Sequence, residues 1–263
     1  MLTKKKLLQW YIESGVDETI GEVPQNRYHS RQEQILLTKQ IPPKPVQQEV
    51  YFQTAPVDNI LSTAVRSSRQ AKNLEELKKA MENFSGCSLK ATAKNTVFGD
   101  GDSHPVVMFI GEAPGADEDK TGTPFVGVSG QLLDKMISAI GLSRTTGAYI
   151  SNIIPWRPPG NRVPSHTEIS LCLPFIQRHI ELIQPKIIVC VGGISFSSLI
   201  GGTETITKAR GKWFSFQSEG LSAPIPVLPI FHPAFLLRSP IQKQKVWADL
   251  LTLSDKINEL AES

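Results

Sequence analysis

Chemically useful side chains follow three apolar segments of the chain. An aromatic ring, Phe125, comes after the first segment, an amide, Asn152, ends the second, and an imidazole, His232, follows the last. Arg157 and Arg238 lie a few residues beyond the second and the last segment. Together these groups can sandwich a planar base, read its edge, stabilise an anionic leaving group and bind phosphate.

Four apolar runs would position these side chains. They span residues 106–110, 149–153, 186–191 and 226–231, and turn-forming residues bound them, which is typical of buried strands. Helical patterns separate the runs, so we expect a parallel α/β sheet with right-handed crossovers. Ligands bind such sheets at the carboxyl edge of the strands, and that is where the residues above are expected to lie.

Helical periodicity is present on both sides of these runs. It covers residues 58–69, 73–84, 132–140, 165–183, 194–200 and 239–260. Pro174 suggests a kink within the fourth of these helices. Residues 116–122 are expected to form a polar loop and residues 99–101 a turn before the first strand. The last helix is expected to direct four apolar residues inward: Trp247, Leu250, Ile257 and Leu260.

The composition is that of a globular chain of 263 residues, with 40% hydrophobic residues and a net charge of +3. No apolar run reaches about 18 residues, so no membrane span is predicted, and the basic start lacks the apolar core of a secretory signal. Three widely spaced cysteines favour a reducing cytoplasm. Residues 1–57 are predicted to be an extension, with a short helix at 4–19 and a linker rich in Pro and Gln, and residues 58–263 the domain.

Three ordered motifs resemble the uracil-DNA glycosylase superfamily, most closely the family 4 iron–sulfur glycosylases of bacteria and archaea. They are Gly-Glu-Ala-Pro-Gly at 111–115 with Pro-Phe-Val-Gly at 124–127, Asn152 with Arg-Pro-Pro-Gly-Asn-Arg at 157–162, and His-Pro-Ala-Phe-Leu-Leu-Arg at 232–238. The resemblance extends from about residue 84 to the last helix. It implies a three-layer α/β/α fold with a four-stranded, mainly parallel sheet. It also implies an enzyme that flips uracil out of DNA and hydrolyses its N-glycosidic bond, leaving an abasic site.

The resemblance also implies a role for each residue of the uracil site. Phe125 would stack on the base, and Asn152 would donate to O4 and accept from N3–H, a pattern that cytosine reverses. His232 would donate to O2 as negative charge accumulates on the leaving uracil. Gly111 and Ala113 complete the site, and Ala113 stands where family 1 enzymes place a water-activating Asp. Taken alone, each of these could instead be a core or turn residue.

Two carboxylates and a set of DNA contacts complete the expected site. Either Glu112 or Glu118 would position the water or offset the oxocarbenium-like sugar, while the other caps a loop. Leu236 and Leu237 would form an insertion loop that fills the gap left by the flipped nucleotide, unless they pack on the last helix. The remaining candidates for contacts to the DNA backbone are Arg157, Arg162, Gly192, Ser195, Lys208, Arg210, Lys212 and Arg238.

The chain departs from the family at the cluster cysteines. The resemblance implies a [4Fe–4S] cluster held by four cysteines, but only Cys87 and Cys172 match ligand positions, while Phe84 and Trp156 occupy the other two. Cys190 lies within the third predicted strand and matches none. Because Phe and Trp cannot ligate iron, we predict no cofactor and an apolar plug in the space of the cluster.

Other functions fit parts of the same pattern. A glycosylase for another deaminated base would use a similar site, and a non-catalytic binder of DNA ends or of a polymerase is the rival class. A uracil-crosslinking enzyme is disfavoured because the loop after the second strand is short and His166 begins a helix. The predicted partner is uracil-containing DNA, single or double stranded, bound by a monomer in the bacterial cytosol.

Overall fold

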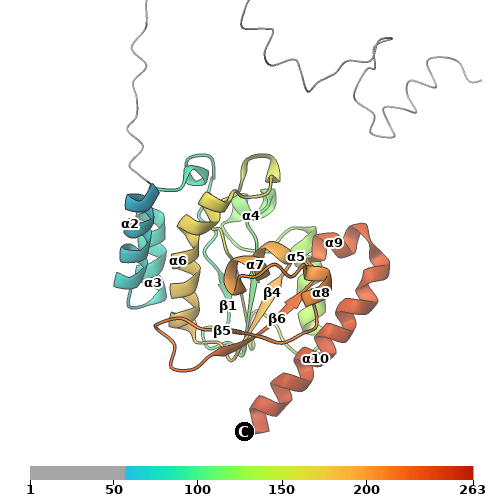
Figure 1. The fold of residues 1–263 in the computed structure, drawn as a ribbon. Helices are drawn as coiled ribbons and strands as arrows, with labels where there is room; N and C mark the ends of the chain where they lie inside the picture. The colour runs from blue at the N-terminus through green and yellow to red at the C-terminus, as the bar shows by residue number, and fades with distance from the viewer. Residues whose placement is uncertain (1–56, 263) are drawn as a thin grey trace, which may run out of the picture. The chain divides into compact units, whose positions relative to one another are not determined.

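The computed structural model describes residues 57–262, and its centre is a six-stranded sheet (Figure 1). The strands lie in the order β1-β3-β2-β4-β6-β5. They span Asp100–Gly101 (β1), Val107–Gly111 (β2), Ala148–Asn152 (β3), Ile187–Val191 (β4), Phe214–Phe216 (β5) and Ile225–Ile230 (β6). The four inner strands are parallel, and the edge strands β1 and β5 pair antiparallel to their neighbours. The predicted class is confirmed, although the predicted count omitted both edge strands, which are too short to show a period.

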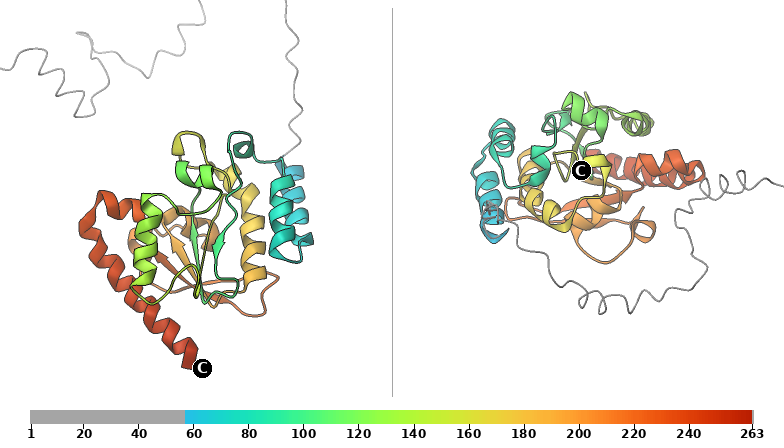
Figure 2. Two further views of the ribbon diagram at one scale, coloured as in Figure 1. Left: turned by 180° about the vertical axis from the view of Figure 1, so that it is seen from behind. Right: turned by 90° about the horizontal axis from the view of Figure 1, so that it is seen from above.

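Helices cover both faces of this sheet. Their bounds are Val57–Gln70 (α2), Leu74–Asn83 (α3), Ala116–Thr121 (α4), Val128–Ser138 (α5), His166–Ile183 (α6), Gly193–Ile200 (α7), Ile206–Ala209 (α8), Pro233–Arg238 (α9) and Lys243–Glu262 (α10), with single turns at Ser88–Ala91 (η2), Pro159–Asn161 (η3) and Pro240–Gln242 (η4). α6 packs on one face and α5 and α10 on the other, while α2 and α3 lie outside α6 (Figures 1 and 2). None of the described helices is long and apolar enough to cross a membrane. The helix predicted at 4–19 and the linker after it lie outside the described residues.

Alternation along β2 divides the core into two halves. Met108 and Ile110 pack toward α6, and Val107 and Phe109 pack toward α5 and α10. All four are fully buried. Both faces of a parallel sheet are covered in this way, so its strands are apolar runs with no polar alternation. Since helices cover both faces, polar side chains of a site can lie at the carboxyl ends of the strands.

Four local predictions were wrong. The supposed turn at 99–101 contains the strand β1. The supposed polar loop at 116–122 contains α4, and the supposed loop after His232 is the helix α9. Trp247 was expected to point inward, but its side chain is 47% exposed. Leu250 is buried as predicted, Ile257 and Leu260 are half-buried against the same core, and Val246 and Leu253 complete the inward face of α10. Because a helix turns by about 100° per residue, Trp247 lies to one side of this inward face and is largely exposed. α6 continues through Pro174.

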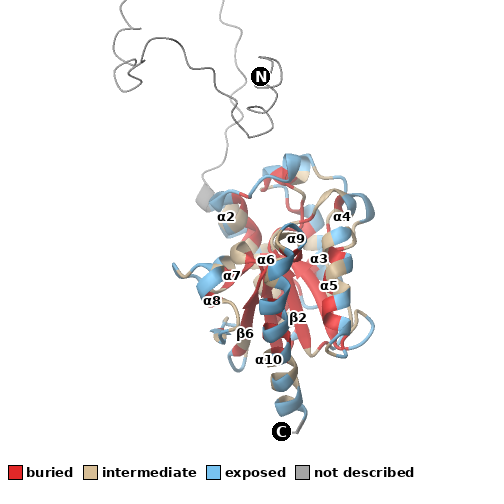
Figure 3. Cartoon of the chain, turned by 90° about the vertical axis from the view of Figure 1, so that its right-hand side faces the viewer, coloured by how far each residue is buried: buried red, intermediate tan, exposed pale blue. Residues whose placement is uncertain are grey.

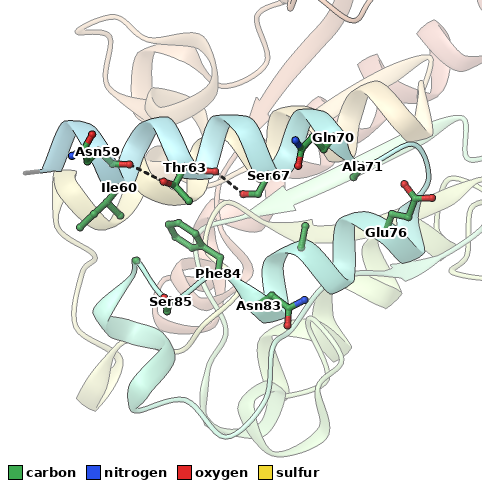
Figure 4. A pocket seen from close by; sticks show the side chains of 12 residues that line it. Asn59, Ile60, Thr63, Ser67, Gln70, Ala71, Glu76, Asn83, Phe84 and Ser85 are labelled. Atoms are coloured by element: carbon green, nitrogen blue, oxygen red, sulfur yellow. Dashed lines mark hydrogen bonds between the residues drawn. The ribbon is translucent and has the colours of Figure 1, made fainter. Parts of the chain in front are cut away.

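A hollow of about 610 Å³ lies between α2 and α3, and side chains of both helices line it (Figure 4). Its lining is mostly uncharged, and the carboxylate of Glu76 already accepts hydrogen bonds from Lys72 N and Asn73 Nδ2. Phe84 lies at one end of this hollow. The hollow is therefore a gap between two surface helices and a poor candidate for a catalytic site.

His179 on α6 should make the stability of the protein depend on pH. It is fully buried, shares a hydrogen bond of 3.0 Å with Tyr149 Oη and stacks on Phe98. Burial lowers the pKa of His179 from 6.5 to about 3. The folded protein therefore holds this imidazole neutral, whereas the unfolded chain protonates it below pH 6.5, so stability is lost as the pH falls from 6.5 toward 3.

The test compares wild type with His179→Gln, which keeps a hydrogen-bonding side chain but cannot titrate. Relative to this variant, the wild-type free energy of unfolding should fall by about 1.4 kcal/mol per pH unit below pH 6.5. Urea unfolding of both proteins between pH 7 and pH 4.5 measures this difference, and all other titrating groups cancel in it. Parallel curves for the two proteins would contradict the prediction.

Candidate active site

Three strand ends bring Phe125, Asn152 and His232 together. Gly111, the last residue of β2, is paired with Asn152, the last residue of β3. A Cβ atom on Gly111 would lie 2.4 Å from Asn152 Oδ1 and 2.6 Å from Phe125 Cζ, so both side chains cover this glycine. The rings of Phe125 and His232 are 5.7 Å apart between centroids. Glycine is therefore required at position 111, because any side chain would displace the amide or the ring.

Asn152 carries a buried side-chain amide at the end of β3. Its residue is 5% exposed, and its Oδ1 has no hydrogen-bond partner within the described residues. Buried polar atoms in native proteins are nearly always paired, so an exception calls for an explanation. A ligand that supplies the missing donor, such as the N3–H of a pyrimidine, would satisfy Oδ1.

His232 is held in one tautomer by the helix that follows it. It is the N-cap of α9, and its Nδ1 accepts a hydrogen bond of 3.1 Å from the backbone N–H of Ala234. Burial, followed by the positive charge of Arg238, lowers the pKa of His232 from 6.5 to about 4. The imidazole is thus neutral at pH 7 and carries its proton on Nε2. This N–H is left free to donate to a ligand.

Phe125 adopts a left-handed backbone conformation, with φ of 55°, which is uncommon for a residue other than glycine. Its carbonyl lies against the start of α5, where a Cβ on Gly130 would come within 1.7 Å of the Phe125 oxygen. The ring is nonetheless almost fully buried, with 6% of the residue exposed. Such strain persists only where the surroundings hold it in place.

Arg144 holds the Phe125 segment and was missed by the sequence analysis. Its guanidinium donates to the carbonyl oxygens of Pro124 (2.8 Å) and Phe125 (2.6 Å). The same group forms ion pairs with Asp134 and Asp100, each at 2.9 Å. Arg144 stands in a turn between α5 and β3 with no motif around it, and its partners are 10 to 44 positions away in the chain. Its role became visible only in the folded structure.

The two carboxylates of the first motif differ in their surroundings. Glu118 accepts hydrogen bonds from the backbone N–H groups of Gly115 (3.1 Å), Val126 (2.9 Å) and Gly127 (2.8 Å). Its carboxylate therefore ties the two ends of the Phe125 loop together, which is a positioning role. The Glu112 carboxylate makes no hydrogen bond or ion pair with the described residues, and burial raises its pKa above the usual value of 4.5. Glu112 remains the carboxylate available to a substrate.

Several predicted DNA contacts are already engaged within the protein. The Ser195 hydroxyl is fully buried and donates to Ile110 O at 2.6 Å, so its side chain is engaged, whereas the predicted phosphate contact used backbone amides. Arg210 is paired with the buried Asp249 and its side chain is 17% exposed. Leu236 is 1% exposed and packs in the core, because the segment is the helix α9. These three side chains are thus engaged within the protein, and their roles in DNA binding stay predictions.

The other predicted contacts remain accessible to varying degrees. Leu237 is 41% exposed, and Arg238 beside it is exposed. Arg157 is half-buried and donates to Asn161 Oδ1, while Arg162 is paired with Glu168. Gly192 has φ of 102° and packs closely on His232, since a Cβ there would lie 3.2 Å from His232 Cβ. Its backbone thus supports the imidazole.

The residues at the cluster positions form a packed, apolar group. The rings of Phe84 and Trp156 are nearly parallel at 6.5 Å, and Phe84 also contacts Phe175 at 5.2 Å. Cys87 and Cys172 are buried free thiols in mutual contact, and their hydrogen bond lowers the pKa of Cys87 while it raises that of Cys172. Among the described residues, no group of three or more His, Cys, Asp or Glu side chains is arranged to hold a metal ion.

The chain is similar in sequence to known uracil-DNA glycosylases. The sequence profile of the Uracil DNA glycosylase superfamily matches residues 98–251. The chain is 40% identical to a type-4 uracil-DNA glycosylase of Sulfurisphaera tokodaii, over 72% of this chain and 85% of that protein. It is 42% identical to the type-4 enzyme of Saccharolobus solfataricus, over 64% of this chain and 79% of that one. The type-4 enzyme of Pyrobaculum aerophilum is 35% identical, with 68% and 91% covered.

Proposed function

The chain belongs to the uracil-DNA glycosylase superfamily, and we propose that it removes uracil from DNA in base excision repair. It hydrolyses the N-glycosidic bond with water and leaves an abasic site. The observation that carries this proposal is the buried, unpaired Oδ1 of Asn152 beside the rings of Phe125 and His232. A flipped uracil supplies the N3–H that this oxygen lacks, and cytosine does not.

Catalysis by this site depends on stabilising the leaving uracil. Phe125 stacks on the flipped base, which contributes about 1–3 kcal/mol. The neutral His232 donates its Nε2–H to O2 while the glycosidic bond breaks and negative charge grows on the ring. One such donor is typically worth about 2.7–4 kcal/mol. The tautomer that Ala234 N–H selects is the one that this step needs.

Glu112 is the group that we assign to the water or to the developing positive charge of the sugar. Ala113 next to it offers no carboxylate, and Glu118 is occupied by three backbone N–H groups. Since burial raises the pKa of Glu112, its carboxylate is a better base than one in water. Leu237 is the wedge that fills the space of the flipped nucleotide, with Arg238 and Arg157 at the phosphates.

The deciding experiment is release of uracil from a labelled oligonucleotide, detected as strand cleavage after alkali. Single- and double-stranded substrates are compared, with hypoxanthine and xanthine in place of uracil as the panel for other deaminated bases. Wild type should act on uracil, and a protein that binds the oligonucleotide without releasing any base would favour the non-catalytic reading. A complex that survives denaturing electrophoresis would indicate crosslinking.

Changing Arg144 to lysine should impair excision through Phe125. Lysine keeps the charge but cannot reach Pro124 O, Phe125 O and two carboxylates at once. A misplacement of about 1 Å can cost about a hundredfold in rate, so we expect kcat/KM to fall by about ten- to a hundredfold. Excision kinetics at a temperature where both proteins are folded measure this effect.

Arg178→Lys is the matched control for this prediction. Arg178 on α6 is similarly buried and donates to Ala71 O and to the carboxylate of Glu181. None of these residues belongs to the active site. Its substitution should lower the melting temperature and leave excision unchanged. Equal losses of activity in both variants would mean that Arg144 acts on stability alone.

The iron–sulfur cluster implied by the family does not fit the residues present. Two thiols, Cys87 and Cys172, are available where four thiolates are needed, and the rings of Phe84 and Trp156 fill the other positions. Trp156 is further fixed by a hydrogen bond from its Nε1 to Thr96 Oγ1. We propose that this packed group replaces the cluster as the structural support of the segment before β1.

Purified protein should accordingly contain far less than the four iron atoms per chain of a [4Fe–4S] cluster. Iron analysis and the absorption spectrum of protein prepared without oxygen from iron-supplemented cells measure this. A Phe84→Cys/Trp156→Cys variant, which restores four cysteines, is the positive comparison. Stoichiometric iron in the wild type would overturn the proposed replacement while leaving the glycosylase assay unaffected.

We further propose that the enzyme acts as a monomer in the bacterial cytosol. Phe125, Asn152 and His232 all come from one chain, so the site is complete without a second copy. The three cysteines are free thiols, as a reducing compartment would keep them. Sedimentation with and without uracil-containing DNA tests the oligomeric state.

A further inference from the structure

Exposed apolar residues lie along α10, the helix labelled in front of the sheet in Figure 3, and in the turn before it. Trp247 is 47% exposed, Leu251 46% and Ile241, in the turn η4 before this helix, 77%. None of them is among the residues of the active site. Isolated apolar residues on a surface need no explanation, but a cluster that includes tryptophan is typical of an interaction site.

Beside Trp247 the surface is hollowed into a groove of about 390 Å³ between α5, α9 and α10. Apolar side chains from all three helices form its walls: Leu132 and Met136 from α5 with Ala139 at its C-cap, Leu236 from α9, and Val246, Trp247 and Leu250 from α10. The groove can therefore bury an apolar side chain of a partner. This lining has no unpaired buried polar atom that would call for a small polar ligand.

The remaining lining residues give the groove its charge. Lys135 on α5 and Lys243 at the start of α10 are exposed and lie at its edge with Gln244, and no acidic residue lines it. Neither lysine forms an ion pair with a carboxylate of residues 57–262. Two unpaired cations beside an apolar groove are complementary to carboxylates that flank an apolar side chain.

We propose that this groove binds a short acidic segment of a partner protein, anchored by a bulky apolar side chain. The apolar side chain enters between α5 and α10 against Trp247, and neighbouring carboxylates pair with Lys135 and Lys243. Aromatic residues at such positions commonly dominate the affinity, while charges at the edge select the partner and speed its association. α9 has His232 at its N-cap and Leu236 in the groove, so a bound segment would lie close to the active site without using its residues.

The test uses the full-length protein and a fluorescent octapeptide in which aspartates alternate with phenylalanine and leucine. Fluorescence anisotropy measures its affinity. We expect Trp247→Ala and the double variant Lys135→Glu/Lys243→Glu each to weaken binding by at least about tenfold. The matched control is Lys79→Glu/Lys186→Glu, which reverses two exposed lysines elsewhere on the surface and should bind as wild type does. Uracil excision should be unchanged in all of these variants.

Two altered peptides and a change of salt separate the apolar from the electrostatic contribution to binding. Lysine in place of each aspartate should abolish binding, alanine in place of each apolar residue should weaken it, and added salt should weaken the acidic peptide because exposed ion pairs are screened. Equal binding of acidic and basic peptides, or no effect of the groove variants, would overturn the proposal.

Two other occupants give distinct results that would also overturn it. If the groove receives DNA, the Lys135→Glu/Lys243→Glu variant will lose affinity for a uracil-free oligonucleotide that competes with the peptide. If it receives a second copy of this chain, sedimentation will show a dimer that Trp247→Ala dissociates. The excision assay is independent of each outcome, so failure here leaves the glycosylase proposal intact.

Discussion

A His232→Ala variant should release uracil about 10²–10³-fold more slowly than wild type in single-turnover reactions. The reason is the loss of one donor to the developing negative charge on uracil, which typically costs about 2.7–4 kcal/mol. Because His232 Nδ1 also caps α9, alanine would remove the cap as well. A His232→Asn variant separates the two effects, since asparagine is a good N-cap residue but its shorter side chain does not place a donor where Nε2 lies.

Both variants should therefore be slow, while His232→Asn should keep most of the thermal stability. If His232→Asn restored the rate, His232 would act through the helix cap alone. The excision rate is measured as uracil release at saturating enzyme, and the thermal stability as the melting temperature of the same preparations.

The pH dependence of the excision rate tests which protonation state of His232 is active. Its pKa is about 4, so the neutral donor is present throughout the range from pH 5 to pH 8. The rate should rise as Glu112 ionises and then stay level as the pH passes 6.5. A rate that fell tenfold per pH unit above 6.5 would show that the imidazolium, and not the neutral ring, is the active form.

An Asn152→Asp variant should lose about 10⁴-fold in kcat/KM for uracil, on the scale by which sites built for a hydrogen bond reject a partner that lacks it. Aspartate has nearly the shape of asparagine but cannot donate to O4 when ionised, and its charge opposes the anion that forms on uracil. An acceptor at this position suits the N4 amino group of cytosine. The ratio of uracil to cytosine release should therefore fall.

Asn152→Ala is the companion variant, and its stability is as informative as its activity. The buried Oδ1 makes no hydrogen bond within the described residues, so its removal leaves no native partner unsatisfied. The variant should thus be inactive yet at least as stable as wild type, because an unpaired buried polar group costs free energy. A large drop in melting temperature would instead indicate that Asn152 is a structural residue.

Most of the fold could be predicted because buried parallel strands are apolar runs with helical periods between them. The runs at 106–110, 149–153, 186–191 and 226–231 correspond to β2, β3, β4 and β6. The edge strands could not be found in this way. β1 is two residues long and β5 three, and both depend on hydrogen bonds to a neighbouring strand that no local pattern records.

The candidate site was predicted in part for a similar reason. Phe125, Asn152 and His232 were expected at one edge because parallel strands end on the same side of a sheet, and the structure places them there. Their catalytic roles stay predictions until the variants are measured. Ser195, Arg210 and Leu236 were expected at DNA from a helix start, a positive charge and the motif at 232–238, whereas their side chains are engaged or buried in the folded protein.

The order of motifs in the sequence by itself determined the family, the parallel sheet and the edge at which the chemistry lies. Only the tertiary structure decided which side chains are available there. Arg144 meets carbonyls and carboxylates from distant parts of the chain, and Trp247 lies exposed beside the face of α10 that Leu250 buries. Such outcomes depend on the packing of segments far apart in sequence, and local patterns of residue type contain no record of that packing.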